Sequence, residues 1–130
     1  MRINTAKGLK AFTSGGYYRG KRDLVARYTW FLHGNKIAYF DGDVLVITSC
    51  GYRTRTTMDR LNAIFRAYSN IYLRQMHFEW YLYAQNGRIR QPWAGTFTLH
   101  FDNDPRGIRE ARDNEATKNP QQGDCFPTES

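Results

Sequence analysis

Hydrophobic and polar residues alternate with a short period in the first part of the middle region, and turn residues separate the apolar runs. Three runs are rich in β-branched and aromatic residues and cover residues 28–32, 36–40 and 44–49. His33-Gly34-Asn35 separates the first two runs, and Asp41-Gly42 separates the second from the third. Asp-Gly between apolar runs is typical of a tight hairpin, because both central turn residues need positive φ. The pattern predicts three consecutive antiparallel strands.

The pattern then changes to the period of a helix. Four large apolar residues follow the i, i+3, i+4, i+7 rule and form one stripe: Leu61, Ile64, Phe65 and Tyr68. Thr56 or Thr57 can cap this helix, and Asp59 lies in its first turn, where the helix dipole favours an acid. Arg60 and Arg66 lie off the stripe, and Ser69-Asn70 is the expected end of the helix.

Two further strands are expected after the helix. Residues 77–84 (HFEWYLYA) read as one strand, Asn86-Gly87 gives a second hairpin signal, and residues 96–101 alternate between polar and apolar side chains. The order β-β-β-α-β-β predicts an α+β domain over residues 27–102. In this domain an antiparallel sheet of about five strands would carry one main helix on a face.

The two flanks differ from this domain in composition. Residues 1–26 are basic and punctuated by glycines without a sustained apolar period, which predicts an irregular arm. Residues 103–130 carry four basic and six acidic residues and few large apolar ones, which predicts a polar acidic tail. The chain is therefore expected to consist of a basic arm, one folded domain and an acidic tail.

Composition and charge restrict the class of protein. The chain has 130 residues, of which 41% are hydrophobic and 15% aromatic, with a formal net charge of +7. This is too apolar for a wholly disordered chain, and no apolar run approaches the ~20 residues that cross a bilayer. Cys50 and Cys125 are too few for a disulfide framework, although a bridge between them stays open. With no secretory signal, the expected location is the cytoplasm, without a membrane partner.

No catalytic or metal-binding motif stands out. Gly15 to Lys21 match the spacing G-x-x-x-x-G-K, but Arg22 follows where a phosphate-binding loop needs Ser or Thr. The histidines, His33, His77 and His100, have no ligand spacing between them. The sequence therefore predicts a protein that is not an enzyme and has no cofactor and no metal. An enzyme of an unrecognised class remains the third interpretation.

Basic residues interleaved with tyrosines form the remaining signal. Cations neutralise phosphates and exposed rings stack on bases, so this combination suits nucleic acid. The candidate contacts are Lys7, Lys10, Tyr17, Tyr18, Arg19, Lys21, Arg22, Arg27, Tyr52, Arg53 and Arg55. The partner is expected to be DNA or RNA, or alternatively an acidic protein surface, because Tyr, Trp and Arg also anchor protein interfaces. A homo-oligomer or larger assembly is compatible with either interpretation.

The stretch between Arg27 and Asn62 resembles small uncharacterised proteins of bacteriophages and plasmids. The resemblance rests on a short run of strands, then Tyr52, then Thr56-Thr57 opening a helix that continues to Leu61-Asn62. It implies a small accessory protein of a mobile element, without catalytic residues, in the host cytoplasm or the virion. The implied roles range from DNA binding to blocking a host defence complex or forming part of a virion.

Overall fold

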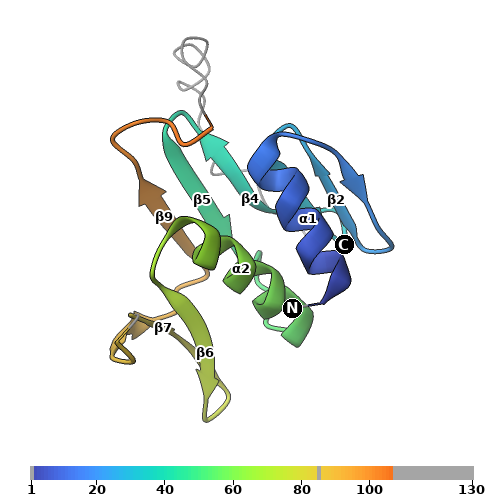
Figure 1. Ribbon diagram of the computed structural model, residues 1–130. Helices are drawn as coiled ribbons and strands as arrows, with labels where there is room; N and C mark the ends of the chain where they lie inside the picture. The colour runs from blue at the N-terminus through green and yellow to red at the C-terminus, as the bar shows by residue number, and fades with distance from the viewer. Residues whose placement is uncertain (1, 85, 107–130) are drawn as a thin grey trace.

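The computed structural model of the protein describes residues 2–84 and 86–106 (Figure 1). Most of the tail expected over residues 103–130, with Cys125, lies outside the described residues. Along the chain the elements are α1 (Ile3–Ser14), β1 (Tyr18–Arg19), β2 (Asp23–Ala26), β3 (Thr29–Leu32), β4 (Asn35–Asp41), β5 (Val44–Thr48), α2 (Arg55–Tyr68), β6 (Tyr72–Met76), β7 (Glu79–Tyr83), β8 (Ile89–Pro92) and β9 (Thr96–His100).

The strands form two antiparallel sheets. The larger sheet has six strands in the order β1-β2-β3-β4-β5-β9, so β9 returns from late in the chain to pair with β5. The pairing of these two strands runs from Thr48 opposite Thr96 to Val44 opposite His100. Strands β6, β7 and β8 form a separate three-stranded sheet. The predicted α+β class, with an antiparallel sheet and a helix on one face, is confirmed.

Both helices lie over the same face of the six-stranded sheet (Figure 1). Successive side chains of each strand point alternately to this face and to the other one, as the two-residue period of a strand requires. The hydrophobic core lies between the helices and the sheet and includes Phe12, Val25, Trp30, Leu45, Ile47, Leu61, Ile64 and Phe65.

Residues 1–26 are not the irregular arm that the sequence predicts. They form α1, β1 and β2, and α1 packs on the core beside α2. The buried face of α1 consists of Thr5, Gly8, Ala11 and Phe12, so it shows no stripe of large apolar residues. A Cβ atom on Gly8 would lie 2.5 Å from the ring of Trp30, which explains why a glycine occupies the middle of this helix. Small residues allow α1 to approach Trp30 closely, but they leave no stripe of large apolar residues from which the helix could be predicted.

The second half of the chain differs from the prediction in two places. Helix α2 begins at Arg55, one residue after its cap, Thr54, whose hydroxyl accepts a hydrogen bond from the Thr57 backbone N–H at 3.1 Å. The helix ends at Tyr68, as predicted. The single strand expected over residues 77–84 is wrong, because His77 and Phe78 form the turn of a hairpin between β6 and β7. Both turn residues have positive φ, which the residue types did not indicate.

Aromatic rings surround Tyr68 at the C-terminal end of α2. Tyr68 lies at the end of α2 within 6.2 Å of the ring of Phe12, 5.9 Å of Phe40 and 6.1 Å of Phe101, measured between ring centroids. Burial among these rings is the main cause that raises the pKa of Tyr68 to about 12. The raised pKa means that the folded protein resists ionisation of this hydroxyl.

This pKa predicts a loss of stability at alkaline pH. In the unfolded chain Tyr68 ionises near its ordinary pKa of about 10, whereas the folded protein holds the proton up to about 12. The stabilisation that comes from protonated Tyr68 should therefore be fully present below pH ~10. Above that pH the free energy of unfolding should fall, by at most about 1.4 kcal/mol per pH unit. Replacing Tyr68 with phenylalanine should remove this part of the decrease.

Urea unfolding of the wild type and of Tyr68→Phe at pH ~9 and pH ~11 tests the prediction. The wild type should lose up to about 1 kcal/mol more than the variant between the two pH values. Equal losses in the two proteins would mean that the Tyr68 hydroxyl does not couple to folding.

Candidate functional site

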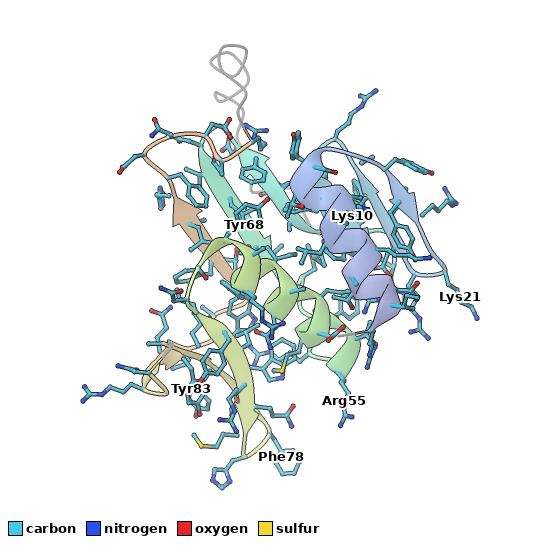
Figure 2. All side chains as sticks on the ribbon, viewed as in Figure 1. Lys10, Lys21, Arg55, Tyr68, Phe78 and Tyr83 are labelled. Carbon is cyan, nitrogen blue, oxygen red and sulfur yellow. The ribbon has the colours of Figure 1, made fainter. Side chains whose placement is uncertain are left out.

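The cations predicted to contact a partner all point into solvent. Lys7 and Lys10 lie on α1, and Arg19, Lys21, Arg22 and Arg27 lie along β1 and the turns on either side of β2. Arg53 and Arg55 lie at the start of α2, and all eight residues are exposed. Figure 2 shows Lys10, Lys21 and Arg55 pointing outward from three different places on the molecule. The eight cations therefore form no single compact cluster, although α1, which carries Lys7 and Lys10, packs against β1 and β2.

Few of these cations have a carboxylate partner. Within residues 2–84 and 86–106, Arg53 has an ion pair with Glu79, with its Nη1 atom 3.8 Å from Oε1, and this pair is exposed. The other seven predicted cations form no ion pair with a carboxylate in the same part of the chain. Their charge is thus available to an anionic partner.

The three predicted tyrosines differ in their accessibility. Tyr17 is 65% exposed and Tyr52 is 39% exposed, so both rings are open to a partner. Tyr18 packs against the core instead, and its hydroxyl donates a hydrogen bond to the Asn4 side chain at 2.5 Å. Tyr18 therefore fastens β1 to α1, and its ring is only partly open to stacking.

Among residues 2–84 and 86–106, the most exposed aromatic residue is one that the sequence analysis did not select. Phe78 stands at the tip of the β6–β7 hairpin with 89% of its surface exposed, and Figure 2 shows it projecting from the end of the molecule. The segment Gln75-Met76-His77-Phe78 contains no Gly, Asn, Asp or Pro, so no turn signal announced it. An interruption of the apolar alternation by Arg74 and Gln75 was the only available hint.

An open groove of about 600 Å³ lies between this hairpin and the start of α2. Its lining consists of Arg55, Met58, Gln75, His77, Phe78 and Trp80. Trp80 is buried below the groove, and its indole N–H donates to the Gln75 side-chain oxygen at 3.3 Å. The groove thus has an apolar floor and polar or charged rims.

One arginine lines this groove, and two others contact residues beside it. The guanidinium of Arg53 lies 5.9 Å from the ring centroid of Trp80, and Arg55 lines the groove itself. Arg2 reaches the same helix start, where its Nη1 atom donates to the Thr56 hydroxyl at 3.0 Å. Glu79 offsets part of this charge through its exposed pair with Arg53. The remaining balance around the groove is positive, which favours an anionic ligand.

The described residues supply no arrangement for metal chemistry. Within residues 2–84 and 86–106, no three His, Cys, Asp or Glu side chains lie close enough together to hold a metal ion. In the same part of the chain, neither helix has the length and apolar character that would let it cross a membrane. The features that stand out are therefore exposed cations, two open tyrosine rings and the groove beside Phe78.

Comparison with known proteins gives one match. The family model of the Kyanoviridae Gp96 protein matches residues 12–102, more than two thirds of the chain. The protein belongs to the Kyanoviridae Gp96 family. No curated protein and no solved structure matches it.

Membership of the Gp96 family confirms the resemblance to bacteriophage proteins that the residues between Arg27 and Asn62 indicate. The matched segment includes Phe12, all strands and α2, so it covers nearly the whole described fold. The family is one of cyanophage proteins.

Proposed function

We propose that this member of the Gp96 family is a phage accessory protein that binds nucleic acid and catalyses no reaction. The observation that carries the proposal is the set of seven exposed cations without a carboxylate partner in the described part of the chain. Lysine and arginine side chains that neutralise phosphates release condensed counterions, which drives binding at low salt. Open rings such as Tyr17 and Tyr52 can add stacking on bases.

The proposal predicts a strong dependence of affinity on salt. With about four phosphate contacts, the affinity for a labelled oligonucleotide should fall by about two orders of magnitude between about 50 and 200 mM salt. Replacing Arg19, Lys21 and Arg22 together with glutamine should weaken binding and reduce the slope of log affinity against log salt by about 2–3. Fluorescence anisotropy over a salt series measures both quantities.

A matched control separates position from net charge. Arg66, Arg74 and Arg88 are also exposed, but none belongs to the predicted contacts, so replacing these three with glutamine changes the net charge equally. This control should leave the slope nearly unchanged. Absence of binding to single- and double-stranded DNA and RNA at about 50 mM salt would overturn the proposal. Capture of a host protein from lysate, unaffected by nuclease, would then favour the protein-binding alternative.

A further inference from the structure

Phe78 lies at the tip of a hairpin whose strands are paired and anchored to the core. Strands β6 and β7 pair over five residue positions, and Leu73, Trp80 and Leu82 of this hairpin are buried in the core. Asn62 of α2 also fastens the hairpin, because its side chain accepts from the Leu73 N–H at 2.6 Å and donates to the Leu73 carbonyl at 3.0 Å. The base of the hairpin is therefore anchored to the core and to α2, and the strand pairing extends from there to the turn that carries Phe78.

The backbone at the tip of the β6–β7 hairpin is strained. His77 has φ 53° and Phe78 has φ 70°, a conformation that costs free energy for residues other than glycine. Asn-Gly would make the same turn without strain, so the residues at the tip are not the ones that turn formation prefers. Stability alone does not explain a large apolar ring in water at a strained position, whereas contact with a partner does.

The groove next to Phe78 has the size and chemistry to accept a nucleobase. Its volume of about 600 Å³ falls within the range of small-molecule sites. Met58, next to the buried Trp80, gives apolar contact for the face of a base, and the side-chain amide N–H groups of Gln75 can donate to its edge. Arg55 lines the groove, and Arg53 lies 5.9 Å from the ring centroid of Trp80, with an exposed ion pair to Glu79 that a phosphate could replace.

Stacking on Phe78 requires an unpaired base. In a duplex both faces of each base are covered by neighbouring base pairs, so an aromatic side chain on a protein surface meets only edges and phosphates. In a single strand the faces are free, and stacking on aromatic rings supplies much of the affinity. The ring and the groove can therefore contact the base faces of a single strand but not the stacked bases of a duplex.

We propose that the groove between the β6–β7 hairpin and α2 binds an unpaired base of a single-stranded nucleic acid, which stacks on Phe78 while Arg53 and Arg55 contact its backbone. This inference rests on the proposed function and makes it more specific. It separates a general cationic surface, which any nucleic acid can use, from a site that only single strands use.

The test compares Phe78→Ala with the wild type on labelled oligo-dT and on a labelled duplex of the same length at about 50 mM salt. The variant should bind the single strand about tenfold more weakly and the duplex within about twofold of the wild type. Phe78→Trp should bind the single strand about as tightly as the wild type does, because tryptophan also offers a ring for stacking. Circular dichroism checks that the exposed substitution leaves the fold intact.

His33→Ala serves as the matched control, since His33 is also an exposed ring at a turn residue with positive φ but belongs neither to the groove nor to the predicted contacts. It should leave the preference for the single strand unchanged. If Phe78→Ala binds oligo-dT as the wild type does, or weakens both ligands equally, the base site is overturned while the proposed function stands. If the wild type binds neither ligand, the proposed function itself fails.

Discussion

Replacing Asp23 with alanine is expected to lower the free energy of unfolding by about 3–5 kcal/mol. Asp23 and Arg60 are both buried, and two hydrogen bonds of 2.8 Å join the Arg60 Nε and Nη2 atoms to the two carboxylate oxygens. The indole N–H of Trp30 donates to the same carboxylate at 2.9 Å. Removing the carboxylate leaves a buried guanidinium without its main counter-charge and an indole N–H without an acceptor.

The expected loss for Asp23→Ala is large because few other groups can pair with the Arg60 guanidinium. The Nη1 atom of Arg60 approaches the Thr5 hydroxyl at 2.7 Å and Asp59 at 3.4 Å, but Nε and Nη2 have only Asp23. The hydrogen bond to Asp23 is also the largest cause that raises the pKa of Arg60. Arginine stays protonated in proteins even without such a partner, so the charge cannot be discharged to relieve the loss. Breaking one side of such a pair costs more than replacing both sides.

Urea unfolding followed by tryptophan fluorescence measures this loss. Asp43→Ala is the matched control, because Asp43 is exposed and only its backbone carbonyl accepts a hydrogen bond, from the Phe101 N–H. The control should change the free energy of unfolding by no more than about 0.5 kcal/mol. A loss below about 1 kcal/mol for Asp23→Ala would show that solvent reaches Arg60 in the folded protein.

The buried Arg60 illustrates why the sequence predicts some elements and not others. Leu61, Ile64 and Phe65 repeat at the helical period, and this local pattern was sufficient to place α2. Arg60 and Arg66 both lie off that stripe, yet Arg66 is exposed and Arg60 is buried. It is buried because α1 covers a second face of α2, which the stripe on α2 alone does not reveal.

The same reasoning applies to the candidate site. Charged side chains stay in water unless they are paired, so the exposure of residues such as Lys21 and Arg55 could be expected from the sequence. The groove depends instead on the turn at His77 and Phe78, which no turn residue signals, and on the packing of that hairpin against α2. Tertiary contacts decide such features, and one sequence does not record them.

Replacing Phe12 with alanine is expected to cost about 3–5 kcal/mol of folding free energy. Phe12 is fully buried on α1, and its ring centroid lies 6.0 Å from that of Trp30, 5.8 Å from Phe40 and 6.2 Å from Tyr68. These three neighbours come from two strands and from α2, so a cavity at Phe12 removes contacts that join both helices to the sheet. Thermal unfolding and urea unfolding both measure the loss.

This prediction also decides whether residues 1–26 are part of the domain. Tyr17→Ala, in the same segment but 65% exposed, is the control and should change the free energy of unfolding by about 0.5 kcal/mol or less. An arm outside the domain would make both substitutions neutral. A large loss for Phe12→Ala alone means that α1 completes the core, so the cations Lys7 and Lys10 are presented on a fixed helix beside β2.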